Sequence, residues 1–478
     1  MIVLLCAWLL QGAATLTPAQ VMLPAPNPAI EQSALRQHLM YLASDERLGR
    51  EAFTPQSKEV AEYLVAALKQ AKVPGAMPDG GYLQAAPFVR REQTGPIELV
   101  LVDAQGKRHG LTYSSQFRLG RERQLDKPMK FAVQVLSADP ASVGKPAADQ
   151  AALFRGTPKE WRTWRDDHVD ETWGLILFYE IDSKERGPLG TPRETVVPGW
   201  TSEEESSEAA TPVIRVYGDL GDWGASVEAL EFEPHRRLVP IDEYNVVGMI
   251  PGVGTPAEPD LAQEVIVLSA HYDHIGVLEE AAEGADRIRN GADDDASGVA
   301  VLLELAEAYA AGPPPARTVL FLFACAEEQG ILGTQYFVHS PPVAFERIVC
   351  NLNLEMLGRP DELVGGAGKL WLTGFERSSL GPAFQAAGID VVADPRLEQN
   401  FFRRSDNIVF VQEGVVAQTL SSYNLHRDYH QVSDEIQFID FDHLTACATA
   451  ALEAARQLSD GKVRPTWNEG EPKGFQKR

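Results

Sequence analysis

The second half of the chain alternates between continuous apolar runs and stretches whose apolar residues recur at helical spacing. The runs at 264–270 and 318–325 are typical of strands buried on both faces, and further strands are predicted at 244–250, 347–354, 370–373 and 415–420. The stretches with helical periodicity are 299–311, 331–339 and 441–458. Ser297 precedes the first of them and is predicted to cap it. This alternation predicts an α/β fold, a three-layer sandwich around a mostly parallel sheet.

The first half of the chain has a different pattern. Residues 31–72 show helical periodicity, interrupted by a turn-like stretch at 44–50. Between 96 and 240, short strand-like runs are separated by polar stretches that carry Pro and Gly, including a loop at 200–210. We therefore predict an inserted, mostly β module. The expected division is a leader at 1–20, the main domain at 28–95 and 241–460, the module at 96–240 and a flexible tail at 461–478.

The leader is expected from an apolar run at 2–10 that is followed by the small residues at 12–14. This order resembles a signal peptide and predicts an exported protein, located in the periplasm, at the cell surface or outside the cell. No later segment approaches the ~20 consecutive apolar residues of a membrane span.

Composition and charge narrow the possible partners. Hydrophobic residues make up 44% of the 478 residues and charged residues 23%, which is typical of a soluble globular protein. Asp and Glu total 68 against 43 Lys and Arg, a formal net charge of −25. This acidity excludes a nucleic-acid backbone binder and disfavours docking on anionic lipid, because both need a basic face. The four cysteines form no C-x-x-C pair, so a cysteine zinc finger is excluded.

Residues that can bind metal follow three of the predicted strands. His271-Tyr272-Asp273-His274 follows the first, Glu327-Glu328 the second and Glu355 the third. Open α/β sheets place their ligand sites at the carboxyl ends of strands, so these side chains are expected at one edge. Asp273 is expected to orient the imidazole of His271, because residues two apart in a strand point the same way.

A tight turn at 290–298 adds three adjacent acids, Asp293, Asp294 and Asp295, between glycine and serine residues. Neighbouring carboxylates repel each other unless a cation compensates their charge. A hydrolytic pair of zinc ions needs imidazoles, carboxylates and one carboxylate that bridges the two ions. The chain supplies all of these donors.

Five blocks of sequence together resemble one family. SAHYDHIG, NGADDDASGVA, AEEQGILGTQYF, NLEM and DYHQVSDE are similar to the co-catalytic zinc aminopeptidases, which include bacterial leucyl aminopeptidases and, more distantly, glutamate carboxypeptidase. The stretch at 39–50 also resembles the lead-in of that family. The resemblance implies a metallopeptidase that binds two zinc ions per chain and acts on peptides. From its position and coarse pattern alone, the module at 96–240 is predicted to be of the protease-associated type.

Carried over residue by residue, the resemblance implies a complete site. The zinc ligands would be His271, Asp294, Glu328, Glu355 and His430, with Asp294 as the bridge. Glu327 would be the general base, Asp273 the support of His271, and Tyr429 a donor to the developing oxyanion. Glu355 stands where the family usually has Asp, and a Glu at this position accompanies carboxypeptidase-like activity in a related clan.

Some alternatives stay open at this point. His274 is predicted to be structural or at the rim, His426 competes with His430 as a ligand, and the segment 404–406 resembles one near the substrate pocket of the family. A carboxypeptidase or dipeptidase is the main alternative to an aminopeptidase. A single-zinc glutaminyl cyclase and a binding module without catalysis, like the transferrin receptor ectodomain, are further ones. Side-chain specificity and oligomeric state do not follow from the sequence.

Overall fold

The computed structural model describes most of the chain. The described residues are 23, 29–119, 125–136, 149–167, 173–180, 195–200, 211–218, 226–279, 281–282 and 284–473. The leader expected at 1–20 and residues 201–210 of the expected loop lie outside them. The chain divides into two compact units, unit 1 (Met1–Ala86 and Glu243–Arg478) and unit 2 (Pro87–Asp242). The module expected at 96–240 falls within unit 2.

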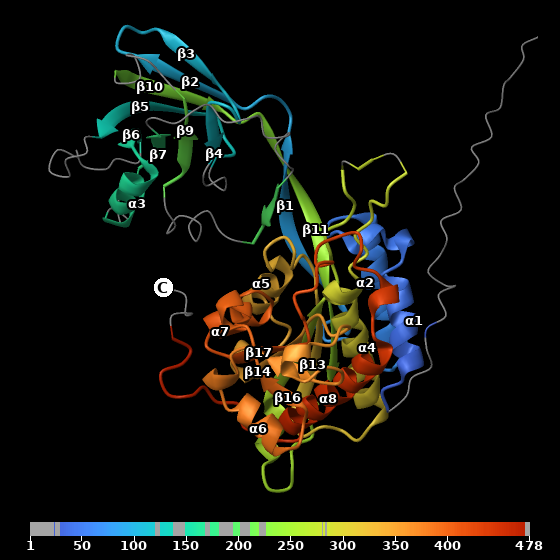
Figure 1. The fold of residues 1–478 in the computed structure, drawn as a ribbon. Helices are drawn as coiled ribbons and strands as arrows, with labels where there is room; N and C mark the ends of the chain where they lie inside the picture. The colour runs from blue at the N-terminus through green and yellow to red at the C-terminus, as the bar shows by residue number, and fades with distance from the viewer. Residues whose placement is uncertain are drawn as a thin grey trace, which may run out of the picture. The chain divides into compact units, whose positions relative to one another are not determined.

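Unit 1 is built on a sheet whose central strands are parallel (Figure 1). Its strands are β1 (Leu83–Gln93), β11 (Arg236–Ile250), β12 (Val265–His271), β13 (Thr318–Ala324), β14 (Ile348–Leu354), β15 (Leu370–Leu372), β16 (Val391–Ala393) and β17 (Val416–Ser421). They lie in the order β16-β15-β17-β14-β12-β13-β11-β1. Strand β12 pairs in parallel with β13 and β14, and β14 pairs in parallel with β17. The pairs β11/β13 and β15/β17 are antiparallel.

Helices cover both faces of this sheet. They are α1 (Gln32–Leu42), α2 (Pro55–Gln70), α4 (Gly298–Ala311), α5 (Leu332–His339), α6 (Leu380–Ala386), α7 (Asn407–Gln412) and α8 (Phe441–Ser459). Helices α1, α2, α4 and α8 pack together on one face, and α5 and α7 pack on the other. Single helical turns lie at Asp45–Arg50, Pro259–Gln263, Ala292–Ser297, Phe345–Arg347, Glu362–Val364, Phe375–Arg377, Leu397–Gln399, Phe401–Arg403 and Ile436–Phe438. The unit thus has the α/β architecture in three layers that the alternating pattern predicts.

The apolar runs explain why the sheet is central. Every residue of β12 and β13 is buried, and α4 is buried along nearly its whole length. Each large apolar side chain buried in this way contributes roughly 1.5–3 kcal/mol relative to an exposed one. The central strands and α4 are therefore the rigid frame on which the residues at the carboxyl edge are mounted.

Side chains cap the starts of two helices, and the start of a third corrects the sequence analysis. Thr54 Oγ1 accepts from Ser57 N at 3.3 Å at the start of α2, and Asp440 Oδ1 accepts from His443 N at 3.0 Å at the start of α8. Ser297 does not cap α4 with its side chain, because its hydroxyl donates to Asp293 O at 2.7 Å. The prediction of a Ser297 cap was wrong. Asp295 instead accepts from Gly298 N at 3.1 Å.

The end of the described chain is held against unit 1. Trp467 Nε1 donates to Gly414 O at 2.9 Å, and Ser379 N donates to Thr466 O at 2.9 Å. Residues 461–473, expected to be flexible, therefore lie in a defined position beside α6 and α7.

Unit 2 contains an eight-stranded sheet of mixed direction. The strands are β2 (Glu98–Asp103), β3 (Arg108–Thr112), β4 (Phe117–Leu119), β5 (Met129–Leu136), β6 (Gln150–Gly156), β7 (Leu175–Glu180), β9 (Val213–Val216) and β10 (Val227–Glu233). Their order is β3-β2-β10-β5-β6-β7-β9-β4, and β8 (Thr195–Pro198) pairs with β1 instead. One helix, α3 (Pro158–Asp167), buries Trp161 and Trp164 against the sheet and was not predicted from the sequence.

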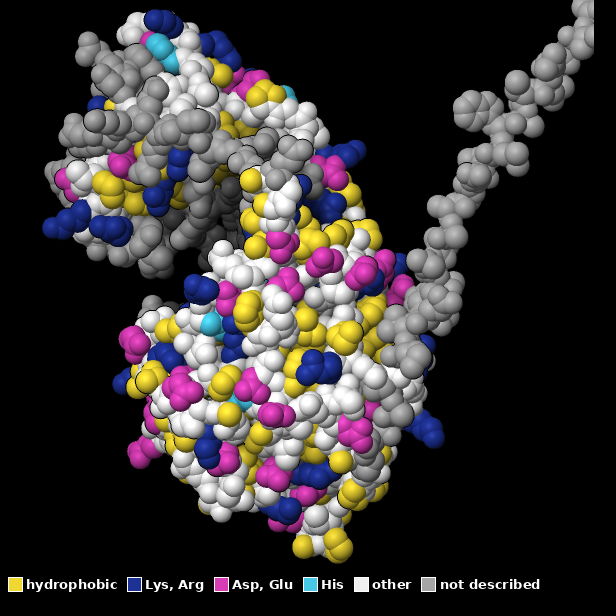
Figure 2. Space-filling model, turned by 45° about the vertical axis from the view of Figure 1, so that its right-hand side comes forward, with side chains coloured by type: hydrophobic (Ala, Val, Ile, Leu, Met, Phe, Trp, Pro, Cys, Tyr) yellow, Lys and Arg dark blue, Asp and Glu magenta, His cyan; other side chains and the backbone are white. Residues whose placement is uncertain are grey.

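Charged side chains of both signs are mixed on the surface of unit 1. On the face of unit 1 drawn in Figure 2, Lys and Arg side chains are scattered singly among Asp and Glu, without a broad basic patch. Among the residues that the structure describes, none of the helices combines the length and the apolar composition that a bilayer span needs.

Candidate metal centre

The strand ends bring the predicted residues to one edge of the sheet. His271 is the last residue of β12 and pairs with Ala324, the last residue of β13. Glu327 and Glu328 follow β13, and Glu355 follows β14 directly. The turn that precedes α4 adds Asp294, and the loop after β17 adds His430. The parallel register of the central strands is therefore what gathers these side chains.

Four of the predicted ligands form a compact group. His271 Nε2 lies 3.4 Å from Asp294 Oδ1, and His430 Nε2 lies 3.2 Å from Asp294 Oδ2. The same nitrogen of His430 is 3.3 Å from Glu328 Oε1. We call His271, Asp294, Glu328 and His430 the edge cluster. Each carboxylate oxygen of Asp294 faces a different imidazole, which is the arrangement a bridging ligand between two cations needs.

Several polar atoms of the edge cluster are buried without a hydrogen bond. Among the described residues, Asp294 Oδ2, Glu328 Oε1 and His430 Nε2 have no hydrogen-bond partner. A buried polar atom left in this way costs about 1–3 kcal/mol. Imidazole nitrogens and carboxylate oxygens are the donors that zinc prefers, and a cation between them satisfies all three atoms. The residues present therefore fit a zinc site.

The charges of the edge cluster depend on each other. Burial by itself lowers the pKa of His430, but the carboxylates of Asp294 and Glu328 outweigh it and raise that pKa to about 10. Burial and Asp294 both raise the pKa of Glu328, but the neighbouring imidazoles of His274 and His430 bring it down to about 2. The carboxylate of Glu328 is thus held in its charged form, which is the form that binds a cation.

Glu355 and Glu327 adjoin the edge cluster. Glu355 Oε2 accepts from Asn353 Nδ2 at 3.4 Å, and burial together with Asp294 raises the pKa of Glu355 to about 7. Burial also raises the pKa of Glu327 well above its usual range, against the opposing effect of His271. A carboxylate with a raised pKa accepts a proton more readily near neutral pH, as a general base must.

His274 lies beside the edge cluster. It is fully buried, and its Nδ1 lies 2.9 Å from Glu328 Oε1 and 3.8 Å from Asp294 Oδ2. His274, Asp294 and Glu328 together could hold a metal ion. Of the two positions predicted for His274, structural or at the rim, its burial excludes the rim. His274 and His430 face the same two carboxylate oxygens.

Asp273 lies beside His271, as the sequence analysis expected, and also contacts the chain after β13. His271 Nδ1 lies 3.2 Å from the main-chain oxygen of Asp273 and 3.8 Å from its carboxylate. The Asp273 carboxylate instead accepts from Glu327 N at 3.0 Å and from Glu328 N at 3.2 Å. Asp273 thus positions the backbone of the Glu327-Glu328 pair. Its main-chain oxygen is the atom of Asp273 that lies nearest to the imidazole of His271.

Three other candidates, Asp293, Asp295 and His426, have partners outside the edge cluster. Asp293 accepts from Gly358 N at 2.7 Å, and Asp295 accepts from Met356 N at 2.9 Å, so both hold the chain after β14. His426 Nε2 lies 3.0 Å from Asp293 Oδ2 and is therefore outside the edge cluster. Of the two histidines in this loop, only His430 reaches Asp294.

A buried arginine that the sequence analysis did not single out organises the site. Arg50 is fully buried and donates to five main-chain carbonyls, those of Leu42, Tyr272, Asn290, Gly291 and Asp294, with Tyr272 O and Gly291 O at 3.0 Å and Asp294 O at 3.3 Å. Burial lowers its pKa, while Asp294 and Asp273 oppose that shift. The resemblance of the stretch at 39–50 to the family lead-in was the signal that could have found it.

A second support comes from Asp434, which was also missed. Its carboxylate accepts from Asp293 N and from Asp294 N at 3.1 Å each. Arg359 donates to Asp434 Oδ1 at 3.0 Å and to Asp428 Oδ2 at 2.7 Å, so it ties the acidic turn to the loop that carries Tyr429 and His430. Nothing in the sequence spacing marks this connection.

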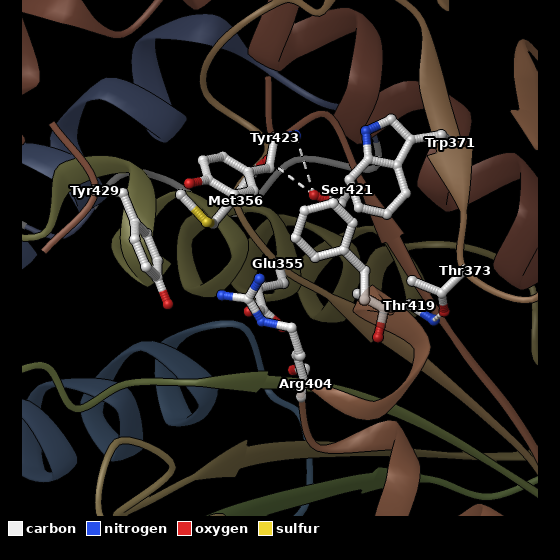
Figure 3. A pocket seen from close by; sticks show the side chains of 11 residues that line it. Glu355, Met356, Trp371, Thr373, Arg404, Thr419, Ser421, Tyr423 and Tyr429 are labelled. Atoms are coloured by element: carbon white, nitrogen blue, oxygen red, sulfur yellow. Dashed lines mark hydrogen bonds between the residues drawn. The ribbon is translucent and has the colours of Figure 1, made fainter. Parts of the chain in front are cut away.

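A pocket of ≈ 380 Å³, including its open mouth, lies beside Glu355 (Figure 3). It is lined by Glu355, Met356, Trp371, Thr373, Phe401, Arg404, Ser405, Thr419, Ser421, Tyr423 and Tyr429. Tyr429 stacks on His430 with 3.9 Å between ring centroids, which places its hydroxyl near the metal centre. Arg404 and Ser405, in the segment predicted to lie near a substrate pocket, do line this one.

Comparisons with known proteins agree with the geometry. Residues 245–455 match peptidase family M28. A probable zinc metalloprotease of Pyricularia oryzae is 31% identical over 216 residues, which are 45% of this chain and 38% of that protein. Leucine aminopeptidase 1 of Emericella nidulans is 25% identical over 309 residues, 61% of this chain and 74% of that protein. The chain spans well under half the length of the first three curated relatives it matches.

The fold also has a solved counterpart. The aminopeptidase from Aneurinibacillus sp. strain AM-1 superposes with a TM-score of 0.50 at 17% identity, covering 94% of this chain and 98% of that one. The resemblance to the zinc aminopeptidases inferred from five sequence blocks is confirmed over the matched residues, whereas the lead-in at 39–50 lies outside them. The protease-associated type of unit 2 stays a prediction.

Proposed function

We propose that this chain, whose residues 245–455 match peptidase family M28, is a zinc-dependent exopeptidase that removes N-terminal residues from peptides. The observation that carries the proposal is Asp294, whose two carboxylate oxygens face His271 and His430 from opposite sides. The proposal includes two zinc ions per chain, because one carboxylate between two imidazoles suits a pair of cations.

The ligands divide between two positions. His271 and Glu355 would hold one zinc ion, Glu328 and His430 the other, and Asp294 would contact both. His274 lies close enough to Glu328 to orient that carboxylate by a hydrogen bond. Zinc held in these positions supplies Lewis acidity at the reacting carbonyl and water.

Glu327 is the proposed general base. Its backbone is fixed by Asp273, and burial raises its pKa, so its carboxylate is held in place and accepts a proton readily. The proton taken from water would pass from Glu327 to the leaving amine as the peptide bond breaks. Tyr429 would donate a hydrogen bond to the oxygen that becomes negative in the transition state.

The pocket beside Glu355 would receive one side chain of the substrate. Trp371, Phe401 and Tyr423 give it aromatic walls, and an apolar side chain is the occupant that such walls favour. The free amine of the substrate would lie near the surrounding carboxylates, whose negative charge attracts an ammonium group.

A carboxypeptidase or dipeptidase is the second candidate. Two observations favour it: Glu355 in place of the usual Asp, and the exposed Arg404 at the pocket, whose guanidinium suits a substrate carboxylate. An arginine at this place could bind the C-terminus of a short peptide.

The zinc-loaded enzyme assayed on blocked and unblocked substrates separates the two candidates. The matched set is leucine amide, N-acetyl-leucine amide and N-acetyl-leucyl-leucine, each with and without a chelator. We expect hydrolysis of leucine amide alone, and its loss when zinc is removed. Cleavage of N-acetyl-leucyl-leucine without cleavage of leucine amide would establish the carboxypeptidase instead. No hydrolysis of any of the three would contradict the exopeptidase proposal.

A further inference from the structure

A second group of ionisable side chains lies within unit 1, outside the edge cluster. His38 comes from α1, and Glu304 and Glu307 come from α4. One possible ligand atom of each lies within 4.8 Å of the other two. Their exposed fractions are 0% for His38, 2% for Glu304 and 3% for Glu307. We call these three residues the buried cluster.

The sequence of α4 makes the two acids unusual. Glu304 and Glu307 are the charged residues of a helix that is otherwise made of apolar residues, Tyr309 and a glycine. They are three positions apart and therefore lie on the same face of the helix. Two carboxylates buried side by side raise each other's energy unless a positive charge lies between them.

One atom pair in the buried cluster lacks hydrogen bonds. Glu304 Oε2 accepts from Glu31 N at 3.2 Å, which leaves Oε1 free to face His38. His38 Nε2 and Glu304 Oε1 lie 3.7 Å apart, and neither has a hydrogen-bond partner among the described residues. That separation is longer than a hydrogen bond, but it is close to the roughly 3.4 Å between two ligands of one tetrahedral zinc ion.

Tyr63 fixes the direction of the imidazole. His38 Nδ1 and the hydroxyl of Tyr63 are 2.7 Å apart, and both side chains are buried. A hydrogen bond from Nδ1–H to the hydroxyl oxygen leaves Nε2 with its lone pair directed at Glu304. Histidines that bind metals are held in this way, by a partner on the nitrogen that does not bind.

The edge cluster shows the same signature in the same molecule. Its unpartnered atoms, His430 Nε2 and Glu328 Oε1, face each other at 3.3 Å. We propose that the buried cluster is a second kind of zinc site, in which His38, Glu304 and Glu307 hold one structural zinc ion between α1 and α4.

The surroundings indicate a structural role. All three residues are at least 97% buried, so substrate has no access to them. Structural zinc sites are closed in this way, whereas catalytic ones keep an open position. The ion would hold α1 against α4, the helix that begins directly after the turn carrying Asp294.

The first test counts zinc in the purified full chain by elemental analysis after dialysis against zinc-free buffer. We expect Glu304→Gln to bind one zinc ion fewer per chain than the wild type, with its rate on leucine amide unchanged. Glu453→Gln, which removes an exposed acid from α8, is the matched control and should keep the wild-type count. An equal count in wild type and Glu304→Gln would overturn the proposal.

Two further measurements protect the test against a variant that fails to fold. Tyr63→Phe keeps the ring and removes only the hydroxyl. We expect this change to weaken the binding of zinc at the buried cluster by roughly 10-fold to 100-fold. Anomalous diffraction at the zinc edge from wild-type crystals should show a peak between His38 and Glu304. A water molecule or no density there would mean that the site is an ion pair only. Neither readout depends on hydrolysis. The buried zinc site can therefore be confirmed or excluded even if the proposed peptidase activity is not found.

Discussion

The edge cluster and the buried cluster share their donor chemistry and differ in their surroundings. Both combine histidine with acidic side chains, and both leave imidazole and carboxylate atoms without hydrogen bonds. The side chain of His430 is 34% exposed, whereas that of His38 is 0% exposed. The ligands thus decide whether a cation binds, while the access of substrate to the cation decides whether it can take part in a reaction.

The residues next to the two clusters differ in the same way: those beside the edge cluster can take part in chemistry, and those beside the buried cluster only enclose it. Glu327, Tyr429 and a pocket adjoin the edge cluster, so a proton acceptor, a hydrogen-bond donor and a substrate can meet there. The buried cluster is closed by Tyr63 and the packed helices α1 and α4. Changes near the edge cluster should therefore alter the rate, and changes near the buried cluster should alter zinc content and stability.

The largest effect is expected from Glu327→Gln. The amide keeps the size of the side chain but cannot accept the proton, so kcat on leucine amide should fall by ~100-fold to 10,000-fold. Steady-state kinetics and elemental analysis of the same sample check this prediction. The zinc content should stay at the wild-type value, as it should in the exposed control Glu453→Gln. A Glu327→Gln enzyme with normal kcat would exclude this residue as the base.

The next effect is expected from Tyr429→Phe. Removing one hydrogen-bond donor to the developing oxyanion should lower kcat by ~100-fold to 1,000-fold and leave KM nearly unchanged. The stacking of the ring on His430 is retained in the variant, so zinc content should not change. A rise in KM with kcat unchanged, or no change in either, would show that Tyr429 serves packing only.

Arg50→Lys separates the edge cluster from the buried cluster. Lysine keeps the charge but loses the fork that reaches Tyr272 O, Gly291 O and Asp294 O, so the bridging carboxylate becomes less fixed. We expect zinc at the edge cluster to bind roughly 10-fold to 100-fold more weakly, as for other residues that position ligands. Competition with a zinc-binding dye measures this change. Excess zinc should restore the rate, which a merely unstable variant would not show.

The smallest effect is expected from Arg404→Met. Arg404 is exposed, so its attraction for a substrate carboxylate is partly screened by water. The variant should lose up to ~10-fold in kcat/KM on leucyl-leucine, and leucine amide, which has no carboxylate, should be unaffected. Equal losses on both substrates would mean that Arg404 supports the pocket instead of binding a carboxylate.

Much of the fold of unit 1 could be predicted because its strands are buried on both faces. Continuous apolar runs such as 264–270 and 318–325 are strong signals, and both proved to be central strands. Helix α3 of unit 2 was missed, since Trp161 and Trp164 lie in a short segment without a longer periodic pattern. The cap of α4 was assigned wrongly because Ser297 could bond either to the helix or back to Asp293, and sequence does not decide between them.

The site was partly predictable for the same reason. The residues that follow central strands had to meet at one edge, and His271, Asp294, Glu328 and His430 do meet there. The position of His274 depends on the turn of the chain after the strand ends, which carries no periodic signal. Arg50 and Asp434 contribute through contacts with backbone atoms far away in sequence, so no spacing reveals them.

The most direct test of the central claim is a zinc titration of the metal-free enzyme in which bound zinc and the rate on leucine amide are measured together. We expect the rate to appear as zinc fills the edge cluster of the wild type. Glu327→Gln should take up the same zinc while staying inactive. A metal-free wild type that hydrolyses leucine amide at the full rate would contradict the proposed zinc-dependent function.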